Sequence, residues 1–325
     1  MLSIVISVVL LLVGFAALIK GADVLVDASA ELGKRLGISE LIIGLTIVAF
    51  GTSLPEMIVN ILANAEGAGD LAIGNIIGSN IANVLLILGI ASLIRPLRVT
   101  RVTVWREILF AMGAGLILVL LVADEFLAEG FVGLDRIDGI MLIVLFALFL
   151  YYSFGRSQTN VEQAEEELGA KENYSFANTF MLIVIGLLGL GIGGELIVRN
   201  ATSLAELIGI SGGVVGLTIV ALGTSAPELA ASISAVRKGK TDLAVGNVVG
   251  SNLFNTFWVL GLNAAILPLA FSSDLYFDVA YAAFAVVVFF GLMAFGRPRH
   301  AISKYEGMVL LSLYGIYIAS LVVRA

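Results

Sequence analysis

Two short segments of the chain carry oxygen-bearing side chains at a spacing that suits cation binding. They read GTSLPE and GTSAPE, and their polar residues are Thr52, Ser53 and Glu56 in the first and Thr224, Ser225 and Glu228 in the second. In each segment the threonine and the glutamate are four residues apart, so they share one face of a helix. Hydroxyl and carboxylate oxygens suit hard cations such as Ca²⁺, which takes six to eight oxygen ligands at about 2.3–2.6 Å, whereas softer transition metals prefer nitrogen and sulfur. The pattern predicts a site for a hard cation.

A proline in each segment should add backbone oxygens to this set. Pro55 lacks an N–H, and its ring clashes with the carbonyl four residues earlier, which is that of Gly51; Pro227 stands in the same relation to Gly223. Each helix is therefore expected to kink or unwind at its GTS segment and to free backbone carbonyls. Further polar pairs follow at i and i+4, namely Ser79 with Asn83 and Ser251 with Asn255.

Composition places these polar residues inside a membrane. Of the 325 residues, 59% are hydrophobic and 13% are charged, against about 25% charged in a typical soluble domain. A carboxylate at mid-bilayer costs at least ~2.5–3.5 kcal/mol on insertion scales, and Glu56 and Glu228 have no Lys or Arg nearby in the sequence. Protonated glutamates that only join helices would explain one such residue. Two of them in matched surroundings indicate a functional site.

Several classes of function are excluded by what the sequence lacks. Cysteine is absent and His300 is the single histidine, which removes thiolate sites, histidine-rich metal clusters and Ser-His triads. We therefore expect no enzyme, no organic cofactor and no nucleic-acid partner. Gly189, Gly191, Gly193 and Gly194 resemble a nucleotide loop only superficially, because no strand precedes them and they lie in an apolar run of membrane length. They are interpreted as helix-packing residues.

The apolar runs predict an all-α integral membrane protein with ten transmembrane helices, each close to the ~20 residues needed to cross the hydrocarbon core. The expected spans are 2–20, 41–64, 71–94, 104–122, 138–154, 177–198, 213–236, 243–267, 276–296 and 306–323. The longest connector, 155–176, is polar and acidic. It divides the spans into two groups of five.

The two groups repeat each other. Residues 44–90 and 216–262 align at an offset of 172 without a gap, and 25 of the 47 paired positions are identical, Gly, Pro, Asn, Thr and Glu among them. Because five is odd, the second group must enter the membrane from the opposite side, which predicts inverted-topology repeats of the kind found in secondary transporters. The expected organisation is a first five-helix repeat at 1–154, a linker at 155–176 and a second five-helix repeat at 177–325.

Basic residues predict the orientation. Of the 18 Lys and Arg, 15 lie on one set of alternate loops, and only Arg136, Arg199 and Arg324 lie on the other. Basic loops stay in the cytoplasm. We therefore expect a multi-pass protein of the cell (inner or plasma) membrane, with both termini outside and the linker in the cytoplasm.

The paired GTS-x-PE and GSN motifs resemble those of the cation/calcium antiporter superfamily, in particular the prokaryotic type of its sodium/calcium exchanger branch. The resemblance covers essentially the whole chain and implies an antiporter that binds Ca²⁺ and Na⁺ alternately. Carried over by position, the implied ligands are Ala49, Thr52, Ser53, Glu56, Ser79, Asn83, Ala221, Thr224, Ser225, Glu228, Ser251 and Asn255. It also implies that spans 1 and 6 slide across the site.

One position departs from the family pattern. Characterised members carry Asp in one half at the position of Asn83 or Asn255, and here both are Asn. This makes potassium co-transport less favoured and leaves the Na⁺ stoichiometry open. A Ca²⁺/H⁺ antiporter is the nearest alternative and a cation channel a second one. The expected partners are the lipid bilayer and the two ions, and a monomer would suffice.

Overall fold

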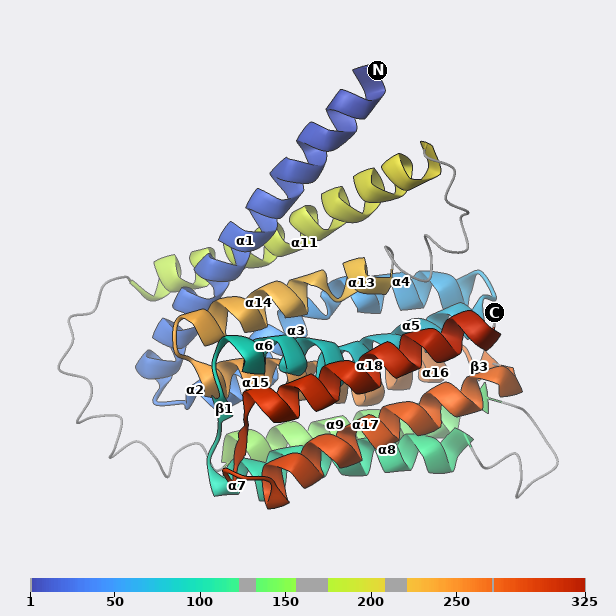
Figure 1. Ribbon diagram of the computed structural model, residues 1–325. Coiled ribbons are helices and arrows are strands. Elements are labelled where there is room, and N and C mark those ends of the chain that lie inside the picture. Colours follow the sequence, from blue (N-terminus) through green and yellow to red (C-terminus); the bar gives the residue numbers. More distant parts are fainter. Residues whose placement is uncertain (1, 123–132, 156–174, 208–220, 271, 325) are drawn as a thin grey trace. The chain divides into compact units, whose positions relative to one another are not determined.

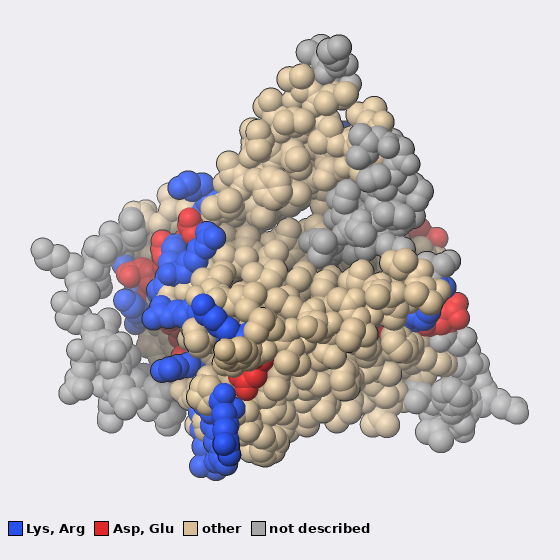
Figure 2. Space-filling model, in the orientation of Figure 1, with Lys and Arg blue, Asp and Glu red and all other residues tan. Residues whose placement is uncertain are grey.

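We analysed a computed structural model of the chain, which describes residues 2–122, 133–155, 175–207, 221–270 and 272–324. It is almost entirely helical, and within these residues eight helices are long and apolar enough to span a membrane. A bent pair of helices, Glu40–Thr52 and Leu54–Ala65, makes a ninth if the pair is counted as one span. The expected span 213–236 and the repeat motif 216–262 begin outside the described residues. Most of the expected linker 155–176 also lies outside them. Figure 2 shows broad areas of the visible surface that carry no Lys, Arg, Asp or Glu side chain.

The described chain forms two compact units, and each combines segments from both halves of the sequence. The first unit is Met1–Pro55 with Arg156–Asn247, and the second is Glu56–Gly155 with Val248–Ala325. The unit boundaries fall within the helices α4 (Leu54–Ala65) and α15 (Thr241–Leu253). The repeats read from the sequence and the compact units of the structure are thus different divisions of the chain.

The first unit is built around two long helices, α1 and α11, which pack against each other (Figure 1). Its elements are α1 (Leu2–Leu36), α2 (Glu40–Ile43), η1 (Gly44–Val48), α3 (Ala49–Thr52), α11 (Phe176–Leu207), α13 (Ala221–Thr224) and α14 (Ala226–Arg237). A Cβ added to Gly21 would lie 2.8 Å from backbone atoms of Gly186 and Gly189, and one added to Gly193 would lie 2.6 Å from the backbone nitrogen of Leu18. Small residues let the two backbones approach closely. The packing role of Gly189 and Gly193 is confirmed, whereas that of Gly191 is wrong, because a Cβ added there would meet no described atom within 4 Å.

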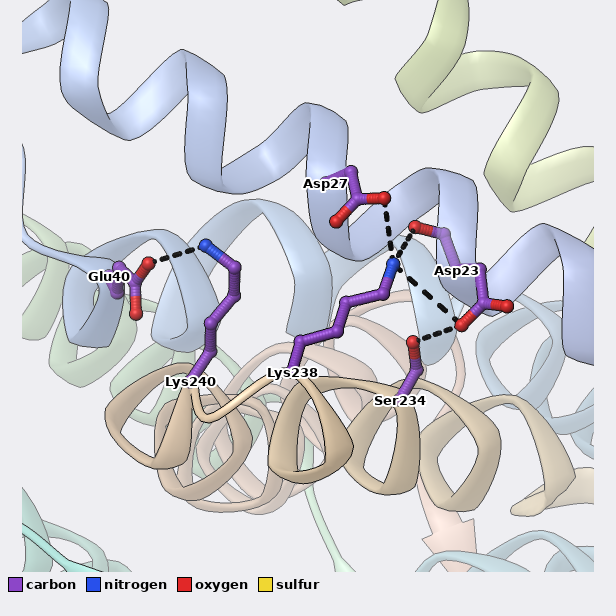
Figure 3. Close-up of polar contacts among 6 residues, drawn as sticks. All are labelled: Asp23, Asp27, Glu40, Ser234, Lys238 and Lys240. Carbon is purple, nitrogen blue, oxygen red and sulfur yellow. Dashed lines mark hydrogen bonds and ion pairs between the residues drawn. The ribbon is translucent and has the colours of Figure 1, made fainter. Parts of the chain in front are cut away.

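Ion pairs add a second connection within this unit (Figure 3). Lys238, which directly follows α14, lies with its Nζ 2.7 Å from Asp27 Oδ2 and donates to the backbone oxygen of Asp23 at 2.8 Å. The Ser234 hydroxyl donates to Asp23 Oδ1 at 2.6 Å. Lys240 pairs with Glu40 at 2.7 Å. These contacts attach α1 and α2 to the connection between α14 and α15.

The second unit surrounds the rest of α4 and α15 with outer helices. Its other elements are α5 (Gly69–Ile81), η2 (Ala82–Ile87), α6 (Leu88–Ile94), β1 (Leu97–Arg98), α7 (Arg101–Thr103), η3 (Val104–Ile108), α8 (Leu109–Val122), β2 (Gly133–Leu134), α9 (Arg136–Gly155), η7 (Phe254–Val259), α16 (Leu260–Ile266), β3 (Leu269–Ala270), η8 (Ser273–Leu275), α17 (Tyr276–Phe295), β4 (Ala301–Ile302) and α18 (Lys304–Arg324). Helices α9 and α16, α8 and α17, and α6 and α18 pack in pairs. The spans Gly69–Ile94 and Thr241–Ile266 are mostly buried, whereas α8, α9 and α18 expose apolar side chains.

Two short strand pairs complete this unit, and the sequence did not predict them. Strands β1 and β4 pair antiparallel with Leu97 opposite Ile302, and β2 and β3 pair with Gly133 opposite Ala270. Each pair joins connections that are far apart in the sequence. They fasten the ends of the outer helices to one another.

The sequence repeat is also visible in local backbone structure. The π-helical turns η2 and η7, Ala82–Ile87 and Phe254–Val259, lie at the same offset of 172 as the repeat motifs. Such turns inside α-helices are frequent at functional sites. They contain Asn83 and Asn255, two of the expected ligands.

Candidate cation-binding site

Each GTS segment breaks its helix at the serine, as the prolines predict. Ser53 has φ −88° and ψ 4°, and Ser225 has φ −88° and ψ 5°, outside the geometry of the flanking helices. At Ser53 the helix axis bends by 46°. Glu56 and Glu228 then lie in the first turns of α4 and α14, where the positive end of the helix dipole favours a carboxylate.

In the first unit, the two motifs meet through their side chains. The Ser53 hydroxyl donates to Glu228 Oε1 at 3.0 Å, and both residues are buried. The other carboxylate oxygen, Oε2, is buried without a hydrogen-bond partner among the described residues. Gly51 faces Leu187 and Gly223 faces Val198, so both GTS segments rest on α11. Ser53 comes from the first half of the sequence and Glu228 from the second.

Asn247 of α15 holds this cluster together, although the sequence analysis did not single it out. Its Nδ2 donates to Ser232 Oγ at 3.0 Å and to the backbone oxygen of Glu228 at 3.4 Å, and its Oδ1 accepts from Thr52 Oγ1 at 3.3 Å. The close approach of Gly246 to Gly44 places α15 against η1. A signal was present, because the motif GN occurs in both repeats.

The expected ligands that remain in the first unit are placed less centrally. The Ala49 carbonyl accepts hydrogen bonds from the Ser53 backbone N–H at 3.0 Å and from Thr52 Oγ1 at 3.3 Å. Thr224 ends α13 and is half-buried, and Ser225 is buried in the turn that follows. Ala221 begins α13, and its side chain lies outside what the structure describes.

In the second unit, Glu56 is fully buried in the first turn of α4. Asn60 donates from Nδ2 to the Glu56 backbone oxygen at 2.7 Å, so it supports the turn that carries the carboxylate. Ser79 and Ser251 are buried on α5 and α15. Ser251 Oγ has no hydrogen-bond partner among the described residues.

Asn83 and Asn255 belong to a buried network of amides in the second unit. Asn83 Nδ2 donates to Asn252 Oδ1 at 3.0 Å, and Asn255 Nδ2 donates to Asn80 Oδ1 at 3.3 Å. Asn80 Nδ2 donates to Thr256 Oγ1 at 3.0 Å. The structure thus brings these two expected ligands together with Asn80 and Asn252, which the sequence analysis had not selected.

The side-chain oxygen atoms around Glu228 are hydroxyl, amide and carboxylate oxygens, and those of the asparagine network are amide and hydroxyl oxygens. Within the described residues, no three Asp, Glu, His or Cys side chains lie close enough to form a metal cluster. Such a donor set suits a hard cation and excludes a preference for soft metals.

Comparison with known proteins identifies the family of the chain. The family model for the sodium/calcium exchanger protein matches residues 6–155 and 178–323. The chain belongs to this family. The sodium/calcium exchanger MaX1 of Methanosarcina acetivorans is 32% identical over 98% of the chain and 99% of its own length. Inner membrane protein YrbG of Escherichia coli is 37% identical over 96% of the chain and 95% of its own length.

A solved structure shares the fold. The sodium-calcium exchanger NCX_Mj, in a crystal soaked with 10 mM Na⁺ and zero Ca²⁺, superposes with a TM-score of 0.82 at 29% sequence identity. The match covers 98% of this chain and 99% of that one. The protein is therefore a multi-pass membrane exchanger, and members of its family are transporters rather than enzymes.

Proposed function

We propose that the protein is a secondary active antiporter that exchanges Ca²⁺ for Na⁺ by alternating access. The observation that carries the proposal is the Ser53–Glu228 hydrogen bond of 3.0 Å, which joins the motifs of the two sequence halves. Relatives described as sodium/calcium exchangers support the choice of ions.

The proposed ligands are the twelve residues implied by the family resemblance, with Glu56 and Glu228 as the charged pair. Glu56 follows Ser53 by three residues, so the segment that bonds Glu228 also leads into the first carboxylate. The breaks at Ser53 and Ser225, with their matched dihedral angles, support equivalent roles for the two motifs. The proposal counts both carboxylates among the ligands, and one chain supplies all twelve ligand residues.

Charge explains why exchange would be obligatory. Two carboxylates carry a charge of −2, which one Ca²⁺ or two Na⁺ would neutralise. An empty site would leave two like charges in a medium of low dielectric constant, where their repulsion is strong. The loaded protein can then change its access between the two sides, whereas the empty protein resists the change. Few charged ligands also favour weak Ca²⁺ affinity, which a carrier needs in order to release its ion.

The proposed topology is ten spans in two inverted repeats, with both termini outside and the central linker in the cytoplasm. Fifteen of 18 basic residues on alternate loops support this orientation. Because the chain has no cysteine, single cysteines can be introduced at Lys238 and Arg324 without a background. An impermeant thiol reagent added to intact cells should label the second and spare the first.

Transport in liposomes tests the proposal. Purified protein is reconstituted, and uptake of radioactive Ca²⁺ is measured with an outward Na⁺ gradient alone or a pH gradient alone. We expect uptake with the Na⁺ gradient and no uptake with the pH gradient. Uptake driven only by the pH gradient would establish the Ca²⁺/H⁺ alternative, and unitary currents in planar bilayers would establish a channel.

A further inference from the structure

Four asparagines and one threonine form a continuous buried network in the second unit. They are Asn80, Asn83, Asn252, Asn255 and Thr256, which lie on α5, η2, α15 and η7. All five side chains are at most 6% exposed. Buried amides are stable only when their donors and acceptors have partners.

One backbone carbonyl fixes the direction of the first arm of the network. Asn252 Nδ2 donates to the backbone oxygen of Asn80 at 3.1 Å. A backbone carbonyl can only accept, so the amide nitrogen of Asn252 must face it. Asn252 Oδ1 then faces the opposite way and accepts from Asn83 Nδ2 at 3.0 Å. This leaves Asn83 Oδ1 directed away from the network.

The second arm joins the corresponding pair of asparagines from the other half of the sequence, but it is held by the Thr256 hydroxyl where the first arm has a backbone carbonyl. Asn80 Nδ2 donates to Thr256 Oγ1, and Asn80 Oδ1 accepts from Asn255 Nδ2 at 3.3 Å. The pairs Asn83–Asn252 and Asn255–Asn80 are the same pair of repeat positions with the halves exchanged, at the offset of 172. Asn255 Oδ1 is thereby directed away from the network as well.

The two outward oxygens have no hydrogen-bond partner in the part of the chain that the structure describes. Asn83 Oδ1 and Asn255 Oδ1 are buried and accept no hydrogen bond from the described residues. A buried carbonyl oxygen without a protein partner needs an explanation, and a cation is a ligand that suits an acceptor oxygen. If either amide were turned over, its NH₂ group would face the cation instead and repel it.

We propose that Asn80 and Asn252 are positioning residues that hold the amides of Asn83 and Asn255 so that their oxygens, and not their nitrogens, face the transported cation. The inference rests on the proposed function, because it assumes that a cation occupies the space beside these oxygens. The network also explains how two neutral asparagines serve as ligands. Their orientation is set before an ion arrives, as outer partners orient the ligands in many metal sites.

Cation binding to the purified protein tests the proposal directly. Asn252→Ala removes the oxygen that accepts from Asn83, and Asn80→Ala removes the one that accepts from Asn255. The matched control is Asn64→Ala, because Asn64 is also a buried asparagine but donates to the backbone oxygens of Asn263 and Leu267. Affinity is read from the increase in melting temperature during titration with CaCl₂ and, separately, NaCl. Removing an orienting partner typically weakens metal affinity about 10–100-fold. We expect this loss for the first two variants and unchanged affinity for the control.

A second pair of variants separates orientation from packing. In Asn83→Asp both terminal atoms are oxygens, so no orienting partner is needed. Adding Asn252→Ala to Asn83→Asp should then weaken binding by about threefold or less, a strong departure from additivity. A role in packing alone would give the same loss in both backgrounds, and that result overturns the proposal. If Asn252→Ala fails to insert into the membrane, Asn252→Asp replaces it, because the aspartate keeps an oxygen that accepts from Asn83. A tenfold loss of cation affinity in Asn252→Asp would also overturn the proposal.

The outcomes for the wild-type protein separate the two proposals. Stabilisation by CaCl₂ or NaCl without Na⁺-driven Ca²⁺ uptake contradicts the proposed antiport, while the variant comparison still decides the orientation. Stabilisation by neither salt contradicts both.

Discussion

The two compact units differ in how their helices are held together. In the first, glycines on both helices, among them Gly21 and Gly193, let the backbones of α1 and α11 approach closely. In the second, aromatic rings pack α8 and α9 against η7. The ring centroid of Phe146 lies 5.8 Å from that of Phe254 and 5.7 Å from that of Trp258, and the centroids of Phe110 and Phe257 are 6.0 Å apart. A smooth glycine surface permits one helix to slide along another, whereas interlocked rings resist it. We therefore expect the first unit to contain the moving helices and the second to stay rigid.

The two units also differ in how they present ligand atoms. The first offers a carboxylate that already accepts a hydroxyl hydrogen bond, Ser53 to Glu228. The second offers amide oxygens directed by other amides, and it contains the second carboxylate, Glu56. The two proposed ligand carboxylates are therefore divided between the units, one in each. The amide oxygens that are held by other amides lie in the second unit, which we expect to be the rigid one.

The largest expected effect tests whether exchange needs both ligand carboxylates, one from each unit. Glu56→Gln and Glu228→Gln each remove one negative charge while keeping the side-chain size. Because direct ligands matter more than outer partners, whose loss costs about 10–100-fold in affinity, Na⁺-driven Ca²⁺ uptake in liposomes should fall below detection in both variants. Gel filtration of the purified variants controls for insertion. Full exchange by either variant would show that one carboxylate suffices, and the comparison would then fail.

Much of this arrangement could be predicted from the sequence, because it follows from strong local constraints. Pro55 and Pro227 cannot continue a regular helix, so the breaks at Ser53 and Ser225 were expected and are found. Span 1 was expected to end at residue 20, but α1 continues to Leu36. Hydropathy predicts only the apolar part of this helix, and beyond it Asp23 and Asp27 pair with Ser234 and Lys238.

The parts that could not be predicted depend on contacts between distant segments. The short strands β1 and β4 pair across about 200 residues of chain, and two-residue strands have no alternating pattern to reveal them. Asn80 and Asn252 are the asparagines of the two GSN motifs. Their proposed role depends on which amide atom faces each hydrogen-bond partner, and only the structure gives that. A polar residue that is identical in both repeats was the available signal.

The next prediction tests the smooth contact between α1 and α11. A Cβ at Gly193 would lie 2.6 Å from the Leu18 backbone nitrogen and 2.8 Å from the Gly14 oxygen, whereas one at Gly191, two residues earlier on the same helix, meets no described atom within 4 Å. Overpacking typically costs about 1–3 kcal/mol, so Gly193→Ala should lower the melting temperature. Gly191→Ala should leave it unchanged or raise it, since Ala favours helix over Gly by about 1 kcal/mol. Equal behaviour of the two variants would show that the glycine contact is not close-packed.

The smallest expected effect concerns the ion pairs of α1. Lys238→Ala removes the contacts to Asp27 and to the Asp23 backbone oxygen, and Arg237→Ala, at the adjacent exposed position, is the control. Asp27 is largely exposed, and exposed pairs contribute about 0–1 kcal/mol and weaken with salt. Lys238→Ala should therefore destabilise the detergent-solubilised protein slightly at low ionic strength, and the difference from Arg237→Ala should vanish at high NaCl. Since Na⁺ is a proposed ligand, the salt series is repeated with choline chloride. A loss that persists at high choline chloride would mean that Lys238 acts mainly through its backbone hydrogen bond, and α1 would then be held more firmly than its glycine surface suggests.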